Sequence, residues 1–441
     1  MCTALHVQIS VCMTRTRSTR KLETAAHENI PMMWLLGGQQ PDHSTLARFF
    51  KANCEQMKGL FKETVEVAVG VGLVEFALHA IDGTRISTVS KDKTLGRKEL
   101  TLLLQRAEEA IAVFEDEVGQ EGDRAAKEEP AGTMPAELSD ALQLKEKIQE
   151  ALAEIDKRER KRKAHKKGAL DPETGEPRGP RVHLADPEAV TMKGRRGYVV
   201  GYNGQAAVDS KAQVIVAADL VASATDNEQM VPMLQEIKDT AGRLAEETTL
   251  DGGFHSATNL EAVANEPTDV YVPDPVMGRK GRSSTRWPYH KDHFEHDPDT
   301  DTYRCPQGKA LTFAYQTVQK RRGNRVIRVY QCHECLHCPH FGECTKDRSG
   351  RRIRIGPQDE LLKRHRKKMA TEQARAKMKL RTAVVEPVFA ILREHLGLKR
   401  LLRRGLENAR AEWYLLCAAY NLRKIWRLCW FPAMKMANRP A

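Results

Sequence analysis

The chain lacks an uncharged apolar stretch long enough to cross a membrane. Its longest candidate, Val67–Ile81, is interrupted by Glu75 and falls short of the roughly 18 to 20 apolar residues that a spanning helix needs. A secretory leader is also missing, because Arg15, Arg17 and Arg20 follow the apolar N-terminal residues instead of preceding them. No internal repeat of fixed period is visible. We therefore expect a cytoplasmic protein without a membrane partner.

Acidic residues are outnumbered by basic ones. The 441 residues include 71 Lys and Arg against 59 Asp and Glu, which gives a formal charge of +12. This excess favours a polyanionic partner, with nucleic acid as the first candidate, because binding releases counterions. An ordinary basic protein whose cations serve solubility is equally compatible with it. The length predicts several units, or one core with large insertions.

Composition and periodicity divide the chain into five parts. The first is helical, and its short helices around a Gly-containing turn suit either a helix-turn-helix DNA reader or any small helical bundle. The third is a helical or coiled insertion that is rich in Glu, Lys, Ala and Leu, with a break near Pro130–Pro135 and a linker at Pro172–Pro180. In order, the parts are residues 1–70, a core with predicted strands made of 71–95 with 179–275, the insertion 96–178, a Cys-rich insertion 276–350, and a basic helical segment 351–441.

Two apolar segments end in an Asp-Gly pair. Leu73–Ile81 predicts a buried strand that runs into a turn at Asp82-Gly83-Thr84, and Thr248–Leu250 predicts a strand that ends at Asp251. If these strands are neighbours, a carboxylate on a packed helix can join the two aspartates. Three such groups can hold two Mg²⁺ ions around one scissile phosphate. Taken alone, each Asp-Gly pair is more typical of a turn than of a metal ligand.

The segment between these pairs predicts an antiparallel β region followed by a helix. Its strands are Tyr198–Val200, Gln205–Val208 and Val214–Ala218, with a hairpin turn at Asp209-Ser210-Lys211. An amphipathic helix is predicted over Asn227–Ala245.

Five segments, taken in order, resemble the insertion-sequence transposases whose DDE triad lies in an RNase H-like core. The similarity extends, with gaps, from about Arg17 to Ile425. The segments are Asp82-Gly83-Thr84-Arg85-Ile86 with Ser90-Lys91, His183-Leu184-Ala185-Asp186-Pro187-Glu188-Ala189, Gly201-Tyr202-Asn203 with Gln205-Ala206-Ala207-Val208-Asp209, Leu250-Asp251-Gly252-Gly253-Phe254, and Val385-Glu386-Pro387-Val388-Phe389.

This resemblance implies an α/β fold, with an RNase H-like core of mixed sheet flanked by helices, two insertions and an α-helical N-terminal region. It implies that Asp82, Asp251 and Glu386 are catalytic and bind Mg²⁺ or Mn²⁺. The implied reaction is hydrolysis at the element ends, which frees a 3′-hydroxyl that attacks target DNA. The implied partner is double-stranded DNA in the nucleoid, with a homodimer in the DNA complex as one option.

Cations near the third carboxylate are candidate DNA ligands. Arg393 follows Glu386 by seven residues, or two helical turns, and matches a Lys or Arg of the family. Arg381 stands one position from the family's usual upstream Arg. A solvated helical surface is the alternative for the basic segments of this region. The DNA-binding candidates are Arg381, Arg393, Lys399, Arg400, Arg403 and Arg404.

The chain departs from the family pattern at several points. Pro387 replaces the usual His or Arg, and because Pro inside a helix costs about 3 kcal/mol, we predict that a new helix begins just before Glu386. Leu250 and Phe254 replace the usual Ala and Tyr. The family also carries several tens of residues before the point where this chain starts, so recognition of element ends is the function most affected.

Five cysteines lie close together in the Cys-rich part, which favours metal over disulfides in a cytoplasmic protein. Four thiolates at this spacing suit a structural Zn²⁺ that staples a loop-rich segment, with nearby histidines as substitutes. A reduced loop without metal and an iron–sulfur cluster are the alternatives. The five are Cys305, Cys332, Cys335, Cys338 and Cys344.

Three rival functions remain open. The first is a DNA-binding remnant without catalysis, the second is a zinc-organised scaffold that binds a protein, and the third is a nuclease that uses the same triad without strand transfer.

Overall fold

The computed structural model is a mixed α/β protein with two sheets. It describes residues 16–88, 94–125, 136–163, 179–194, 197–280, 285–319 and 325–430. Met1–Met13, Ser90-Lys91, the predicted break at Pro130–Pro135 and most of the Pro172–Pro180 linker lie outside these residues. Within the described ranges, every helix is too short or too polar to cross a bilayer.

From residue 16 onward the described N-terminal part is helical, as predicted, with α2 (Thr19–Glu28), α3 (Ile30–Leu35), α4 (His43–Ala52) and α5 (Gln56–Gly70). Asp42 caps α4 by accepting a hydrogen bond from the Thr45 amide at 2.5 Å. Gly37 and Gly38 follow α3 with positive φ, a conformation that glycine adopts without strain. Helices α2 to α4 share a small apolar cluster, whereas α5 belongs to the main core.

The main sheet has six strands: β1 (Leu78–Ser87), β2 (Val190–Gly194), β3 (Gly197–Asp209), β4 (Ile215–Val221), β5 (Glu247–Leu250) and β6 (Asp269–Tyr271). β3 is antiparallel to β1, β2 and β4, and β5 is parallel to both β1 and β6. β1 therefore lies inside the sheet, between β3 and β5.

Two strand predictions need correction. The predicted turn at Asp82-Gly83-Thr84 is instead the middle of β1, where these residues pair with Ala206, Gln205 and Gly204. The reason is that β3 pairs with β1 from His79 to Ser87, so the chain stays extended and Asp-Gly does not turn it. Likewise, the predicted strands Tyr198–Val200 and Gln205–Val208 are one strand, β3.

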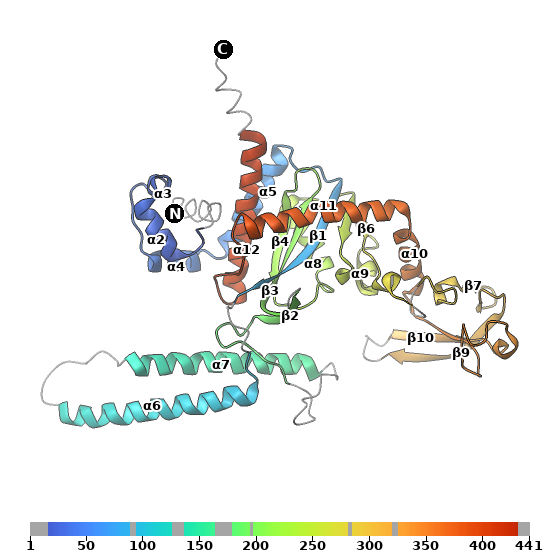
Figure 1. Cartoon of the computed structure of the whole chain (residues 1–441), viewed down its shortest axis with the longest axis horizontal. Helices are drawn as coiled ribbons and strands as arrows, with labels where there is room; N and C mark the ends of the chain where they lie inside the picture. The colour runs from blue at the N-terminus through green and yellow to red at the C-terminus, as the bar shows by residue number, and fades with distance from the viewer. Residues whose placement is uncertain are drawn as a thin grey trace, which may run out of the picture.

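Helices pack on this sheet: α8 (Met230–Ala241), α9 (Ala257–Ala262), α10 (Asp359–Met369), α11 (Glu372–Glu394) and α12 (Leu406–Ile425). α8 ends earlier than predicted because Gly242 adopts a left-handed C-cap with φ 84°. α12 packs against β4 and α5, while α11 crosses the sheet and contacts β1, β3, β5 and β6 (Figure 1). Fully buried Trp413, Tyr202 and Phe254 belong to the core between these elements.

Two long helices, α6 (Arg97–Ala125) and α7 (Ala136–Lys163), lie side by side away from the main sheet (Figure 1). This confirms the helical periodicity of the segment. Leu100, Ile148 and Ile155 are buried between the two helices, and Arg97 pairs with Glu159 at 3.1 Å. The end of α7, Lys157–Lys163, is rich in Lys and Arg.

The Cys-rich part forms a second sheet with strand order β11-β10-β9-β8-β7. Its strands are β7 (Glu295–Asp297), β8 (Thr302–Arg304), β9 (Ala310–Gln319), β10 (Arg325–Gln331) and β11 (Arg352–Ile355). The prediction of a loop-rich segment with little apolar content was wrong, because Phe294, Tyr303 and Tyr330 give this sheet its own core. Since β11 pairs with β10, the basic helical segment begins after β11 and not at Arg351.

Pro387 lies inside α11, so the prediction of a new helix just before Glu386 was wrong. Proline has no N–H, which leaves the Ala383 carbonyl without its helical donor. The Gln213 side chain supplies the missing donor, because its Nε2 lies 3.1 Å from the Ala383 oxygen. Gln213 is itself fixed by α12, since Lys424 Nζ donates to its Oε1 at 3.1 Å. The helix continues through the proline because this side chain replaces the missing backbone donor.

We expect Gln213→Ala to lower the free energy of unfolding by about 1 kcal/mol, the usual net value of such a hydrogen bond. In a Pro387→Ala background the restored N–H satisfies Ala383, so the same substitution should cost clearly less. Denaturant unfolding of the four chains of this double-mutant cycle measures the difference. The hydrogen bond from Lys424 disappears in both backgrounds, so its effect cancels. Equal destabilisation in the two backgrounds would refute this role of Gln213.

Candidate active site

The parallel pairing of β1 with β5 brings Asp82 and Asp251 together. Ile81 is in register with Leu250, so the aspartates occupy the next position on each chain segment. Asp251 follows the last residue of β5 and precedes the short 3-10 helix η1 (Gly252–Phe254). Asp82 lies within β1 and not at its end, which differs from the prediction of two strand ends. Their neighbouring positions follow directly from the register.

The Asp82 carboxylate is half-buried and has two hydrogen-bond donors. Its Oδ1 accepts from the Gly83 amide at 2.8 Å, and its Oδ2 accepts from Arg381 Nη1 at 3.0 Å. Burial raises the pKa of this carboxyl above its usual value, and the nearby Asp251 charge adds to the rise, while Arg381 opposes both. Arg381 therefore compensates a negative charge that would otherwise be costly to bury.

Helix α11 carries the predicted third carboxylate and both predicted arginines. Arg381 pairs with Asp82, and Arg393 donates a hydrogen bond to the Thr84 hydroxyl, two residues further along β1. Glu386 lies between them on the helix, with an exposed side chain. Within the described chain it makes no hydrogen bond or ion pair. The two arginines thus attach α11 to β1, while Glu386 is not in contact with either aspartate.

Asp226 is a further acidic residue at this site. Its Oδ1 accepts hydrogen bonds from Asn203 Nδ2 and Gln205 Nε2, both at 2.7 Å. A β-carbon at Gly253, two residues after Asp251, would lie 3.3 Å from Asp226 Oδ2. Sequence reasoning missed this aspartate because it precedes a predicted helix, where acidic residues commonly act as caps. The available signal was an acidic residue in the loop that links a buried strand to that helix.

The glycine in Asp82-Gly83 makes room for this second carboxylate. Successive strand residues point to opposite faces, so Gly83 faces away from the Asp82 side chain. A β-carbon at Gly83 would stand 2.5 Å from Asp226 Oδ1 and 2.7 Å from Gln205 Nε2. No larger residue fits there without displacing Asp226. Glycine therefore follows Asp82 because of this close packing and not because the chain turns.

The carboxylate and amide oxygens at this site are of the type that binds a hard divalent cation. Mg²⁺ and Mn²⁺ prefer carboxylate and amide oxygens, and Asp82 and Asp251 follow paired residues of β1 and β5, whereas Asp226 lies beside Gly83 on the other face of β1. Gln205 Oε1 is fully buried without a hydrogen-bond partner, although its amide nitrogen binds Asp226. As the side chains stand, no three His, Cys, Asp or Glu groups in the described ranges are placed to hold one ion.

The predicted basic residues after α11 differ in their surroundings. Lys399, Arg400 and Arg404 are exposed. The Arg403 guanidinium instead lies 4.1 Å from the centre of the Phe50 ring on α4, a cation–π contact that joins the two segments. Arg17 also holds the segment after α11 in place, because its guanidinium donates a hydrogen bond to the Gly397 carbonyl at 2.7 Å. Three of the four candidates are therefore accessible to a ligand.

The five predicted cysteines gather around one cavity of about 20 Å³ in the second sheet. All are free thiols, and Cys335 Sγ accepts a hydrogen bond from the Arg351 amide at 3.2 Å. Burial, together with the neighbouring Cys335 and Cys305 thiols, raises the pKa of Cys332 to about 11. Of the nearby histidines, His340 lines the same cavity, whereas His333 and His337 do not.

Comparison with known proteins gives two family matches. A family described as "Transposase DDE domain" matches residues 304–426, which include the cysteines, Glu386 and both arginines of α11. A family described as "Transposase domain (DUF772)" matches residues 4–52, which include α2 to α4. Neither match reaches Asp82 or Asp251. No curated protein matches the chain.

Proposed function

We propose that this chain, which belongs to the DDE transposases of insertion sequences, cuts DNA at the ends of its element and joins the freed 3′-hydroxyl to target DNA. The observation that carries the proposal is the register that sets Asp82 beside Asp251. Transposase membership implies DNA as the substrate, while the cleavage and strand-transfer chemistry is our proposal.

The arrangement of the main sheet supports an RNase H-like core. It is a mixed sheet in which β1 lies between an antiparallel and a parallel neighbour, and helices pack against it. We propose that the core consists of residues 71–95 and 179–275 with α11 and α12, and that the α6–α7 hairpin and the second sheet are insertions into it. The N-terminal helices α2 to α4 would then form a separate DNA-binding part.

Asp82 and Asp251 would hold the divalent ions, with Glu386 completing the triad. Bound Mg²⁺ or Mn²⁺ would supply an activated attacking oxygen and charge stabilisation at the leaving oxygen. For Asp82 to bind an ion, its Oδ2 must exchange the Arg381 guanidinium for the ion. The freed Arg381, whose buried Nε has no hydrogen-bond partner, would then be available to a DNA phosphate.

Arg393 has a related role in this proposal. It lies two helical turns after Glu386 and already reaches β1 at Thr84, so it can position a phosphate along the same strand. The exposed Lys399, Arg400 and Arg404 would extend the contact to the neighbouring backbone of double-stranded DNA. A homodimer in the DNA complex belongs to the same proposal.

We expect Asp82→Asn, Asp251→Asn and Glu386→Gln each to reduce Mg²⁺-dependent nicking of a duplex carrying the element end by at least about a hundredfold, since metal-assisted charge stabilisation contributes several kcal/mol. Asp226→Asn should lower nicking less, because Asp226 lies on the other face of β1 from Asp82 and bonds Asn203 and Gln205 instead of a proposed ligand. The inverted repeats that flank the gene define the duplex, and gel assays measure nicking and strand transfer.

Two exposed residues supply matched controls: Glu372→Gln in the first turn of α11 and Asp140→Asn on α7 should leave nicking unchanged. Nicking by Asp82→Asn at the wild-type rate would refute the proposal that the triad is catalytic. DNA binding without nicking by the wild type would instead favour the non-catalytic remnant, and nicking without joined product would favour a nuclease. Little DNA binding by the wild type would favour the zinc-organised scaffold that binds a protein.

We also propose a structural Zn²⁺ at the cysteine cavity. A cavity of about 20 Å³ accommodates one small ion, and four thiolates are the usual ligands of structural zinc. Cys305 follows β8 and Cys332 follows β10, so binding would connect two hairpins of the sheet. The thiols must turn toward the ion, since they are not yet placed around a common point.

Metal analysis should find about one zinc per wild-type chain, and Cys335→Ser should lose it together with thermal stability, because bound metal contributes to folding free energy. Cys429→Ser, which lies outside the cluster, is the control and should retain zinc. Iron with visible absorption would point to an iron–sulfur cluster. A wild-type chain without metal, purified from zinc-supplemented cells, would rule the site out.

A further inference from the structure

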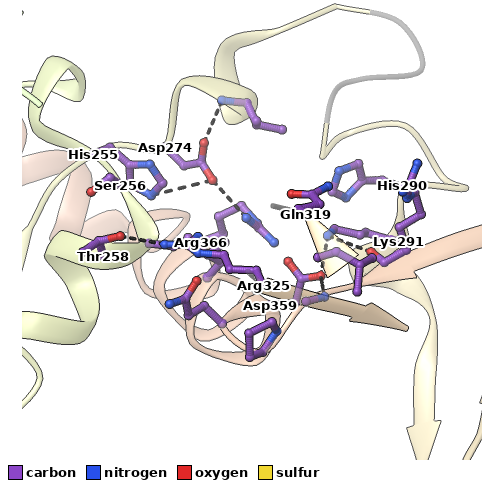
Figure 2. A pocket seen from close by; sticks show the side chains of 18 of the residues that line it. His255, Ser256, Thr258, Asp274, His290, Lys291, Gln319, Arg325, Asp359 and Arg366 are labelled. Carbon is purple, nitrogen blue, oxygen red and sulfur yellow. Dashed lines mark hydrogen bonds and ion pairs between the residues drawn. The ribbon is translucent and has the colours of Figure 1, made fainter. Parts of the chain in front are cut away.

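A cleft of about 860 Å³ separates the main sheet from the second sheet. His255, Ser256 and Thr258, from the segment that follows β5, line one side (Figure 2). Arg325 of β10 and Arg354 of β11 line the other side. Neither side belongs to the carboxylate site. We call this space the inter-sheet cleft, and its size is that of a ligand pocket.

His255 presents an unused polar atom to the inter-sheet cleft. Its side chain is only 8% exposed, and its Nε2 has no hydrogen-bond partner. The nearest acid is Asp274, whose Oδ2 lies 3.7 Å away and already accepts from Arg366 at 2.9 Å. Burial lowers the pKa of His255, so the ring is neutral near pH 7 and has one N–H to donate. A buried donor without a partner is costly unless a ligand satisfies it.

The opposite wall supplies positive charge. Arg325 donates to the Thr258 hydroxyl at 2.8 Å, and Arg354 contacts the Thr317 hydroxyl at 3.5 Å. Among the described residues, neither arginine is paired with a carboxylate. By contrast, the acids of the cleft are already neutralised: Asp274 pairs with Arg366, and Asp359 pairs with Lys291 at 2.7 Å. The cleft therefore offers two arginine charges to an anion.

The inter-sheet cleft is adjacent to the carboxylate site. Asn227, which lines it, directly follows Asp226, and His255 follows Asp251 by four residues. Four residues span at most roughly 14 Å, which corresponds to about four nucleotide steps at roughly 3.4 Å each. A strand whose phosphate lies at Asp251 can therefore extend into the cleft.

We propose that the inter-sheet cleft binds the sugar-phosphate backbone of the DNA strand next to the bond that is cut, with Arg325 and Arg354 on phosphates and His255 donating to a phosphate oxygen. This inference rests on the proposed function. It gives the second sheet a role in substrate binding, in addition to holding the structural Zn²⁺ proposed above. The two walls already meet at the Arg325–Thr258 hydrogen bond, and the DNA strand would add a further connection between them.

The test is binding of a fluorescein-labelled DNA duplex of arbitrary sequence, measured by anisotropy over a range of salt concentrations. The double variant Arg325→Gln/Arg354→Gln should weaken binding by on the order of tenfold. It should also reduce the slope of log K against log salt by about 2, or roughly 0.9 for each phosphate that the variant no longer neutralises. Ethylation interference on the element-end duplex should lose its signal at phosphates near the cleaved bond.

The matched control is Arg304→Gln/Arg348→Gln, which removes the same charge from the second sheet outside the cleft. It should change the salt slope by less than half as much, and it should leave the ethylation pattern intact. Equal effects of the two double variants, or wild-type binding by the first, would overturn the cleft as a phosphate site. A wild-type chain that binds DNA but does not nick it would refute only the proposed catalysis, so the two failures are distinguishable.

Discussion

The parallel pairing of β1 with β5 is the constraint on which the rest of the site depends. Because Ile81 and Leu250 are in register, two aspartates that are distant in the sequence become neighbours without any loop having to position them. β3 holds β1 from the other side and contributes Asn203 and Gln205, whose amides orient Asp226. Asp82 is thus fixed by the backbone hydrogen bonds of a strand inside the sheet, and Asp251 by its place directly after the neighbouring strand. Such support is more precise than that of a loop.

Helix α11 completes this arrangement from a distant part of the chain. Arg381 and Arg393 attach it to β1, and Gln213 keeps it continuous where Pro387 removes a backbone hydrogen bond. The charge of Asp82 is balanced by the Arg381 guanidinium. A divalent ion would perform the same electrostatic task, and the arginine would then become free for the phosphate that the ion also attracts.

Local patterns predicted the N-terminal helices, the α6–α7 pair and the strand that ends at Asp251, because periodicity and caps are local signals. The place of Asp82 inside β1 was not predictable, because it depends on pairing with β3, which is distant in sequence. Asp226 was missed since nothing in its own segment distinguishes a cap from a site. Tyr303 and Tyr330 give the Cys-rich sheet a core, yet they lie on short strands whose pairing was not visible. Continuity through Pro387 depends on Gln213, about 170 residues away.

The central claim is that Asp82 and Asp251 share a divalent ion, and Mn²⁺ bound to the crystalline protein tests it most directly. Anomalous scattering from manganese should give a peak between the two carboxylates, about 2.1 Å from an oxygen of each, with the Arg381 guanidinium moved away from Asp82. A peak that is absent under saturating Mn²⁺, or that lies elsewhere while Arg381 stays on Asp82, would contradict the account.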